Sequence, residues 1–368
     1  MLTAGAIVTL ELGHYRLREQ IAGSAYGVVW RASGPRATQD VALKLINQQQ
    51  MALALPQQRA RWVASASNEI AFLESLEPWD ERHIVRLLDS GMHERLPVLA
   101  LELMACDLGQ HVAALRQAGR SLSLVQVLDW VGQINQALAK VHQYGWRYLD
   151  LKPANVLLDR HLNTVKLADF GTNRVRDDLN AHSYAGTANW QAPEQFFPAR
   201  PGGGYATGMR SDYFALGALF YFLVSGGLPL RFCSDCGQAY REHHTGGADV
   251  LRRRSGGAIP ATLQADEEAS FGRRIEDAMD AVRAGLGDPA WRPAPSAYGG
   301  CAEAALKLLR ALLAPDPDQR PGHAIQISRM LASVRAALMG PQRVALSELV
   351  RVVGRPSAQN GWPALGDA

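Results

Sequence analysis

The stretch Tyr148–Gly171, which reads YLDLKPANVLLDRHLNTVKLADFG, predicts a hairpin that brings two polar loops together. Its apolar run Val156–Leu158 predicts a short buried strand, and Val165–Ala168 predicts a second strand after a turn. The polar side chains that flank these strands are Asp150, Lys152, Asn155 and Asp169. Three oxygen-bearing side chains and one ammonium group suit a hydroxyl nucleophile, a hard metal ion and a phosphate. We therefore expect the hairpin to carry an active site.

The composite D-L-K-P-x-N followed by D-F-G resembles the catalytic and metal-binding loops of the protein kinases. Kinases have His-Arg before the catalytic acid, whereas this chain has Tyr148 and Leu149. The resemblance implies an α+β fold of two lobes, a small β-rich lobe with one main helix and a larger, mostly helical lobe. It implies that Asp150 accepts or orients the proton of the attacking hydroxyl and that Lys152 neutralises the transferring phosphoryl group. Asn155 and Asp169 would hold Mg²⁺.

Composition is that of an ordinary globular protein. The chain has 368 residues, 47% hydrophobic and 20% charged, which is enough for two lobes with sizeable cores. A net charge of +3 does not indicate a nucleic-acid partner or an anionic membrane. Four cysteines are too few for a disulfide scaffold and favour a reducing cytoplasm, and residues 1–13 lack a secretory signal pattern. The uncharged run Tyr213–Leu230 predicts a buried helix rather than a membrane span, because glycines and Pro229 weaken its end.

Residues 1–104 are expected to form the first, ATP-binding lobe. Strands are predicted at Tyr15–Ile21 and Val28–Ala32 around a turn over residues 22–27. This turn resembles the kinase glycine-rich loop, or else is an ordinary hairpin turn. The strand Val41–Lys44 resembles the one whose lysine grips the ATP phosphates. The nucleotide-binding residues that the resemblance implies in this lobe are Ala22, Ser24, Gly27, Val29, Ala42, Lys44, Leu101, Glu102 and Met104.

An acid on the predicted helix over residues 59–76 should pair with Lys44. Glu69 adjoins the apolar face of that helix, whereas Glu74 would lie on another face, so we favour Glu69. The strand Val98–Met104 then enters the connector between the lobes. By resemblance its Leu101 lines the back of the adenine pocket, and the backbone over residues 102–104 bonds the adenine. Asp107 is expected either to cap the next helix or to meet the ribose.

The second lobe is expected over residues 105–340. A long amphipathic helix, Leu124–Tyr144, leads to Asp150 and is ended by Gly145. Residues 169–194 resemble a kinase activation segment, and the end Gly186–Glu194 resembles the G-T-x-x-Y-x-A-P-E of Ser/Thr kinases. The contacts that the resemblance implies are Thr187 with Asp150 and Lys152, Glu194 with Arg320, and Asp212 with amides of the catalytic loop.

The two residues before the catalytic acid also carry expectations. Leu149 has no donor for a phosphate, so we expect activity that does not depend on the arginine–phosphate switch of many kinases. Tyr148 is expected to stack beside Phe170.

Residues 231–300 resemble an insert and are a candidate partner site. Cys233-Ser-Asp-Cys236-Gly237 suggests a zinc knuckle with His243 and His244, or with the remote Cys301, although no complete four-ligand spacing is visible. The other interpretation is two reduced cysteines with surface histidines. The arginine run at 252–254 suggests either a solvated face or a partner site. Helices are expected near residues 266–283, 301–313, 324–339 and, in the tail 341–368, at 345–353.

Three functional hypotheses follow. The first is ATP- and Mg²⁺-dependent transfer to Ser or Thr of a protein substrate. The second is a pseudokinase scaffold that binds nucleotide or partners without turnover, prompted by Ala22, Ser24 and the altered Tyr148–Leu149 pair. The third is a small-molecule kinase, against which the segment Gly186–Glu194 argues, because it resembles a peptide-docking platform.

Overall fold

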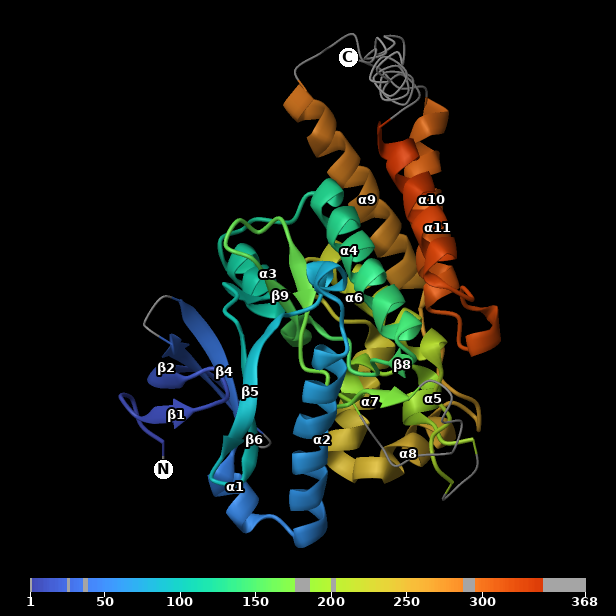
Figure 1. The fold of residues 1–368 in the computed structure, drawn as a ribbon. Helices are drawn as coiled ribbons and strands as arrows, with labels where there is room; N and C mark the ends of the chain where they lie inside the picture. Colours follow the sequence, from blue (N-terminus) through green and yellow to red (C-terminus); the bar gives the residue numbers. More distant parts are fainter. Residues whose placement is uncertain are drawn as a thin grey trace, which may run out of the picture.

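A six-stranded antiparallel sheet occupies the N-terminal part of the computed structural model (Figure 1). The structure describes residues 2–24, 27–35, 39–175, 186–199, 203–286 and 295–339. In spatial order the strands are β1 Ile7–Thr9, β2 His14–Gly23, β3 Gly27–Ser33, β4 Asp40–Ile46, β6 Leu96–Glu102 and β5 Leu87–His93. Because β2 continues through Gly23, which pairs with Val28, residues predicted to open a turn belong to the strand ladder instead.

The alternation of side chains along β4 places Lys44 on the sheet face opposite the apolar cluster. Val41, Leu43 and Leu45 are buried in a cluster with Tyr15 and Leu17 of β2 on one face of the sheet. Since successive side chains of a strand point to opposite faces, Ala42 and Lys44 lie on the other face. The helix α2 (Pro56–Glu74) follows the short α1 (Gln48–Leu53) and packs against β5 and β6 through Phe72 and Leu73.

The remainder is mostly helical, as Figure 1 shows. Its helices are α3 Leu108–Gln117, α4 Leu124–Gln143, α5 Pro193–Phe196, α6 Met209–Val224, α7 Arg231–His243, α8 Gly247–Arg254, α9 Ala265–Leu286, α10 Pro295–Leu312 and α11 Ala324–Met339. Ser123 caps α4 by accepting from the Gln126 amide at 3.2 Å, and Gly145, at φ +81°, ends the helical stretch in the left-handed region. The sheet and these helices together form the expected two-lobed α+β fold.

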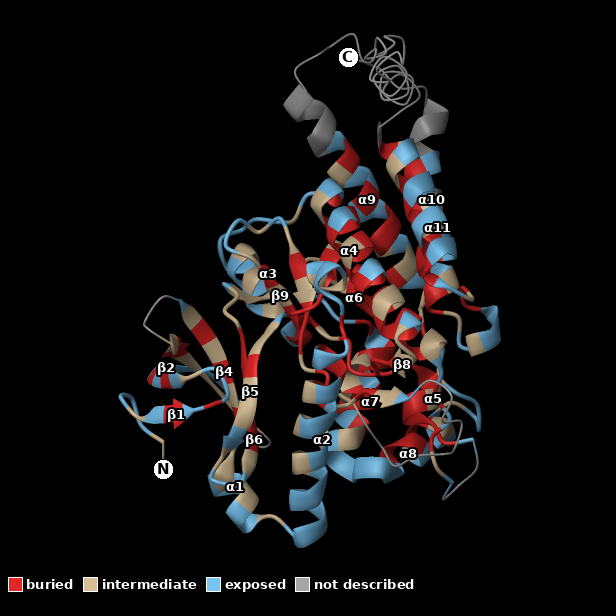
Figure 2. Cartoon of the chain, viewed as in Figure 1, coloured by how far each residue is buried: buried red, intermediate tan, exposed pale blue. Residues whose placement is uncertain are grey.

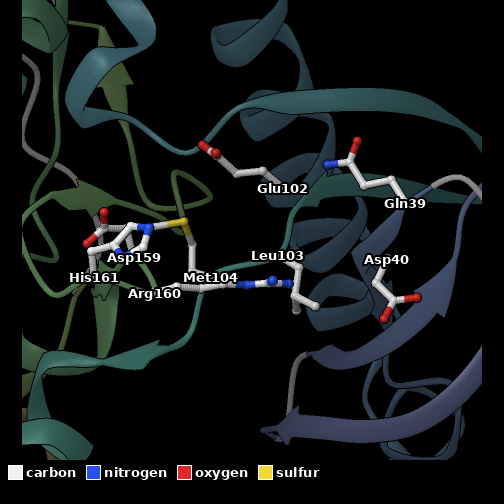
Figure 3. Close-up of a pocket in the computed structure, with 8 residues that line it drawn as sticks. All are labelled: Gln39, Asp40, Glu102, Leu103, Met104, Asp159, Arg160 and His161. Atoms are coloured by element: carbon white, nitrogen blue, oxygen red, sulfur yellow. The ribbon is translucent and has the colours of Figure 1, made fainter.

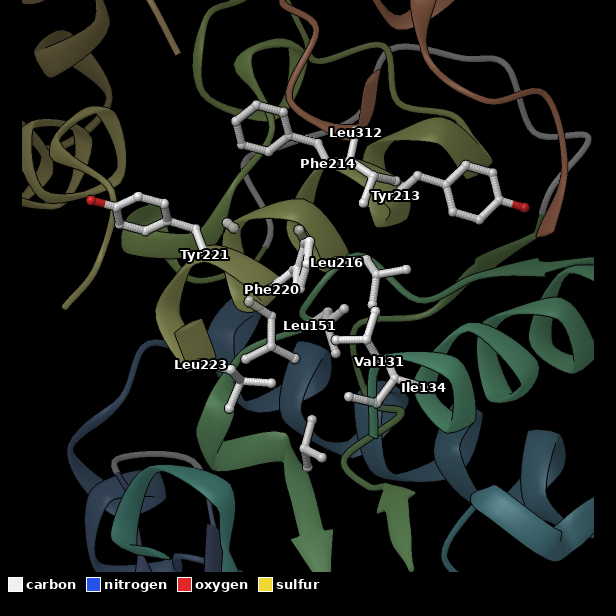
Figure 4. Close-up of a cluster of buried hydrophobic side chains, with 14 of the residues drawn as sticks. Val131, Ile134, Leu151, Tyr213, Phe214, Leu216, Phe220, Tyr221, Leu223 and Leu312 are labelled. Atoms are coloured by element: carbon white, nitrogen blue, oxygen red, sulfur yellow. The ribbon is translucent and has the colours of Figure 1, made fainter. Parts of the chain in front are cut away.

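The apolar helix α6 is the centre of the larger lobe. Its buried residues meet Val131 and Ile134 of α4 and Leu312 of α10 in one cluster (Figure 4). Gly217 permits this approach, because a Cβ there would lie 2.7 Å from the Leu312 Cβ. Buried residues concentrate where α4 and α6 meet, whereas the outer faces of α10 and α11 are exposed (Figure 2). Within the described residues no helix is both long and apolar enough to cross a bilayer.

Two short sets of paired strands surround the segment Tyr148–Gly171. β9 (Val156–Leu158) pairs antiparallel with β10 (Val165–Leu167), and on its other side with β7 (Cys106–Asp107). β8 (Trp146–Arg147) pairs with β11 (Arg174–Val175). The first ladder sets Asp150–Asn155 and Asp169 at adjacent ends of one hairpin, as the sequence predicted.

The predicted zinc knuckle is wrong. Residues 233–237 lie inside α7, where Cys233 and Cys236 are one turn apart and buried among apolar side chains, whereas His243 and His244 are exposed. Cys301 is buried on α10 and donates weakly to the Val334 carbonyl at 3.9 Å. Among the described residues no three His, Cys, Asp or Glu side chains gather as a metal site. Burial raises the pKa of both α7 thiols, which keeps them protonated and disfavours metal binding.

Gly237 has a packing role within α7 instead of a place in a zinc knuckle. A Cβ at this position would lie 1.8 Å from Asn189 Oδ1, because α7 packs directly on the 3₁₀ turn Ala188–Trp190. The nearby arginine run is also not a uniform solvated face. Arg252 donates to the Pro198 carbonyl at 2.8 Å and lies over the Phe197 ring, while the next two arginines are exposed.

Other expectations fall outside the described residues. These are the tail 341–368 with its predicted helix at 345–353, the centre of the loop at residues 25–26, and residues 176–185 of the predicted activation segment.

Candidate active site

Lys44 joins the two lobes through two carboxylates. Its Nζ lies 2.6 Å from Glu69 Oε2 on α2 and 2.8 Å from Asp169 Oδ1 after β10. Burial alone would lower the pKa of Lys44, but Asp169 and Glu69 outweigh it and raise that pKa. The ammonium group of Lys44 in turn holds the pKa of Asp169 below its ordinary value. A lysinium and an ionised Asp169 therefore face each other at neutral pH.

The helix α2 contacts the metal-binding loop twice. Besides Glu69, Ser65 donates to the Gly171 carbonyl at 2.8 Å. Ser65 and Glu69 are four positions apart and so share one face of the helix. Glu74 bonds Ser90 Oγ instead, at 3.0 Å, and does not compete for Lys44. The choice of Glu69 over Glu74 therefore agrees with the geometry.

Asp150 lies at the centre of a second group of contacts. Lys152 Nζ donates to Asp150 Oδ2 at 2.7 Å and to Thr187 Oγ1 at 2.8 Å, and Thr187 Oγ1 donates to Asp150 Oδ1 at 2.8 Å. Asn155 Nδ2 bonds the Asp150 carbonyl and Oδ2 at 3.0 and 3.1 Å. Burial raises the pKa of Asp150, and the Lys152 ammonium opposes that rise. The structure thus contains the implied Thr187 contacts, and a carboxylate with a raised pKa is suited to accept a proton.

A buried aspartate holds the backbone of the catalytic loop. Asp212 on α6 accepts from the Tyr148 amide at 2.9 Å and from the Leu149 amide at 2.6 Å. His142 of α4 contacts the same carboxylate through Nε2 at 2.8 Å. Leu149 has φ +64° and Asp169 has φ +60°, a conformation that costs free energy for non-glycine residues. The contacts of Asp212 help to hold that strained backbone in place.

Tyr148 packs beside Phe170 with ring centroids 5.2 Å apart, but the ring planes are tilted by 58° and do not form the predicted stack. Phe170 also packs on Phe72 of α2, with centroids at 4.6 Å. The Tyr148 hydroxyl, which is fully buried, donates to the Ala168 carbonyl just before Asp169. The tyrosine therefore fills the apolar column and also fixes the backbone at the start of the metal-binding loop.

A buried arginine pairs with Glu194, the last residue of the predicted activation segment. Arg320 Nη1 and Nη2 lie 2.7 and 2.9 Å from the two Glu194 oxygens, in the bidentate geometry that arginine favours. Arg320 is buried, lies over the Phe214 ring, and also donates to carbonyls at Ala314 and Pro315. This is the partner that the sequence implied for Glu194.

The connector between the lobes is Glu102–Met104, which follows buried Leu101 on β6. The Glu102 carboxylate is occupied by Lys166 Nζ at 2.5 Å and by the Arg86 amide at 2.8 Å, and the Glu102 amide donates to the Arg86 carbonyl at 3.0 Å. Asp107 caps α3, accepting from the Gln110 amide at 2.9 Å, so the cap is the role observed.

A cavity of about 510 Å³ opens beside the connector (Figure 3). Its lining consists of Gln39, Asp40, Glu102, Leu103, Met104, Asp159, Arg160 and His161. Lys44, Asp150 and Asp169 do not line it, so this cavity is not where phosphate chemistry is placed.

The donor set fits Mg²⁺ with a polyphosphate. Asp169 uses Oδ1 for Lys44, and its side chain remains 46% exposed, so it keeps an accessible ionised oxygen. Asn155 offers an amide oxygen from the opposite loop, and hard cations prefer such oxygen ligands.

On the first lobe, the Ser24 amide donates to the Gly27 carbonyl at 2.8 Å within the predicted phosphate loop. Val29 and Ala42 lie on β3 and β4 beside Lys44.

Several supporting residues escaped the sequence-based prediction. No sequence motif indicates a role for His142, Ser65 or Arg147. Gln195, which follows Glu194, also had no predicted role, and it donates to the Leu149 carbonyl at 3.0 Å. Two signals were available. Ser65 lies one helical turn before Glu69, and a tyrosine in a buried column needs an acceptor for its hydroxyl.

Comparison with known proteins places these observations in one family. The family model described as protein kinase domain matches residues 15–332. Cyclin-dependent kinase 20 of Danio rerio is 30% identical over 218 residues, 58% of each chain. The carbon catabolite-derepressing protein kinases of Saccharomyces cerevisiae and Candida glabrata are each 28% identical over 219 residues, 59% of this chain. The matched regions span 32% and 33% of those two relatives and 58% of the first, so this chain covers less than two thirds of each.

Proposed function

The chain belongs to the protein kinase family, and we propose on this premise that it transfers the γ-phosphoryl group of ATP to Ser or Thr hydroxyls of protein substrates with Mg²⁺. The observation that carries the proposal is the contact of Lys44 with both Glu69 and Asp169, alongside Asp150 bonded to Lys152 and Thr187. The names of the Saccharomyces cerevisiae and Candida glabrata relatives, both carbon catabolite-derepressing protein kinases, support a protein as the substrate.

Each residue has a task in this mechanism. Lys44 binds phosphate oxygens of the nucleotide, and the connector backbone over residues 102–104 bonds the base. Asn155 and Asp169 hold Mg²⁺, which when bound neutralises charge on the phosphate oxygens. Asp150 accepts or orients the proton of the substrate hydroxyl. Lys152, bonded to Asp150 before the substrate arrives, is in place to neutralise the transferring group.

Thr187 supports a Ser or Thr substrate. It bridges Asp150 and Lys152 through a single hydroxyl and follows Gly186, whose φ is +93°. A Cβ at residue 186 would lie 2.7 Å from the Leu149 carbonyl, so the segment approaches the catalytic loop closely. Together with Lys152, the Thr187 contact favours Ser or Thr hydroxyls over Tyr as acceptors.

The test is transfer from [γ-³²P]ATP to a mixed protein substrate, followed by phosphoamino-acid analysis. Wild type is expected to yield phosphoserine or phosphothreonine, and Asp150→Ala is expected to reduce the rate by about 10³-fold or more. Transfer that survives Asp150→Ala would refute the assignment. Phosphotyrosine as the main product would refute the Ser/Thr assignment alone.

A pseudokinase scaffold is the second candidate, favoured by Ala22 and Ser24 at positions where kinases use glycine. A thermal shift with Mg·ATP separates part of this question, because a scaffold that has lost nucleotide binding shows none. Binding without transfer on any Ser or Thr substrate would favour the scaffold.

The four cysteines are free thiols, which supports the cytoplasm as the proposed location.

A further inference from the structure

Arg147 is a buried arginine one residue before the aromatic column. It lies on β8, its exposed fraction is 1%, and no sequence motif indicates a role for it. Its Nη2 donates to the Val175 carbonyl at 2.8 Å. Its Nη1 donates to the Thr207 carbonyl and, at 3.2 Å, to Thr207 Oγ1. One guanidinium group thus contacts two segments that are far apart in the sequence.

One of those two segments lies near the beginning of the activation segment, and the other follows its end. Val175 is on β11, six residues after Asp169, and Thr207 lies between Glu194 and α6. Val175 also pairs with Trp146 in the β8–β11 ladder. The planar guanidinium holds its donors in a rigid fork, so it fixes both acceptors relative to β8. The contact therefore ties the beginning of the segment to the stretch that follows its end.

The location of this cation distinguishes it from a surface arginine. Removing a guanidinium from water is costly, and a buried arginine is retained only where its hydrogen bonds are satisfied. A purely apolar side chain at residue 147 would fill the space but would leave the Val175 and Thr207 oxygens without this donor. The guanidinium N–H groups of Arg147 therefore order the backbone at Val175 and Thr207, which packing by a large apolar side chain alone would not do.

We propose that Arg147 is a positioning residue that holds β11, which follows Asp169, and the stretch that precedes α6 in their working arrangement without a phosphate group. Leu149, which replaces the arginine of many kinases, offers no donor to a phosphate. Arg147 instead binds carbonyl oxygens, which are always present, so its contact is independent of modification. Thr187 docks the other end of the segment on Asp150 and Lys152. The expected effect of Arg147 on turnover rests on the proposed kinase function. Its contact with Val175 and Thr207, here called the tie, does not.

The first experiment uses unmodified wild-type protein. The protein is treated with phosphatase, its unphosphorylated state is verified by mass spectrometry, and its initial rate is measured before autophosphorylation accumulates. The rate is expected to stay within about twofold of the untreated protein. A loss of about tenfold or more that rephosphorylation restores would overturn the proposal.

The second experiment compares Arg147→Met with Arg147→Lys. Arg147→Met is expected to lower kcat by about 10- to 100-fold, because a shift of β8 against β11 misplaces Asp150, which follows β8 closely in the chain, and to change KM for ATP less than about twofold. Arg147→Lys keeps a cation that reaches one acceptor and should be intermediate, which covers the case in which Arg147→Met does not fold. The matched control is Arg310→Met, which removes an exposed arginine paired with Glu268 and Glu303. Full kcat in both folded Arg147 variants would contradict the proposal.

Hydrogen exchange separates this inference from the function on which it rests. Amides of the β8–β11 ladder should exchange faster in either Arg147 variant, while those of α4 should not. This readout needs no turnover. If wild type transfers no phosphate but exchange at β11 rises in the variants, the tie stands and the kinase assignment fails. Unchanged exchange at β11 overturns the tie whatever the activity.

Discussion

Lys44 Nζ and Asp169 Oδ1 lie 2.8 Å apart although 125 positions separate them in the sequence. One residue is on the sheet of the first lobe, and the other follows the hairpin of the second. Their contact therefore holds the two lobes in one relative position across the proposed nucleotide site. Glu69 adds a third element, α2, to the same ammonium group.

Glu69→Gln should lower kcat about tenfold or more, because a neutral amide of the same shape no longer holds Lys44. Glu69 is 1% exposed, so the change also tests a buried charge. The measurement is steady-state kinetics with ATP varied. Glu74→Gln is the matched control, since it lies on the same helix but bonds Ser90, and it should retain full activity. Equal effects of both substitutions would argue against the assignment of Glu69.

Tyr148→Phe should lower the free energy of unfolding by about 1 to 2 kcal/mol, because the Ala168 carbonyl loses a buried donor while the ring packing on Phe170 remains. It should also lower kcat, since Ala168 precedes Asp169. The measurement is chemical denaturation together with the rate of transfer. Tyr144→Phe, which removes a partly buried hydroxyl bonded to Asp80, is the control and should leave kcat unchanged. Unaltered stability and rate in Tyr148→Phe would show that the hydroxyl has no structural role.

The acid limb of the kcat–pH profile should belong to Asp150. Its ionised form accepts the proton, so kcat falls as pH falls through its pKa, which burial raises above the ordinary value for aspartate. Lys152→Met removes the ammonium group that opposes this rise, so the limb should move to higher pH even though kcat is lower at every pH. The profile is measured from about pH 5 to 8. Lys166→Met, which removes the partner of Glu102, should leave the limb in place. A limb that Lys152→Met leaves in place, or moves to lower pH, would contradict this assignment.

Gly237→Ala should destabilise the protein by about 1 kcal/mol in wild type, because the new methyl group meets Asn189 Oδ1. In an Asn189→Ala background the same change should stabilise it by up to about 1 kcal/mol, since alanine is the better helix former. A reversal of sign in this double-mutant cycle is measured by denaturation. The same sign in both backgrounds would show that Asn189 does not restrict residue 237.

The sequence predicted the catalytic core well because its residues belong to short, local patterns. Asp150, Lys152 and Asn155 lie within six positions, and a hairpin of three-residue strands forces Asp169 beside them. The pairing of Glu69 with Lys44 was expected from the resemblance to kinases, and the position of Glu69 beside the apolar face of the helix favoured it over Glu74. The structure adds that alternation along β4 places Lys44 away from the apolar face of the sheet.

Residues 231–254 were misread because local spacing outweighed the context. C-x-x-C-G is typical of a metal knuckle, but the same five residues place two thiols one turn apart on a helix, with the glycine facing a neighbouring turn. Which of the two forms depends on what packs there, and the contact of α7 with Asn189 is not visible in the sequence. Arg147 was missed for a related reason, because its acceptors are backbone carbonyls that no side-chain pattern reveals.

The most direct test of the account is a paired measurement on Asp150→Asn, a change that keeps the shape of the side chain. Mg·ATP binding is measured by calorimetry, and single-turnover transfer to a Ser/Thr substrate is measured on the same preparation. The account predicts an affinity within about threefold of wild type and a transfer rate lower by about 10³-fold. Transfer at the wild-type rate with binding intact would contradict the central claim that Asp150 acts on the substrate hydroxyl.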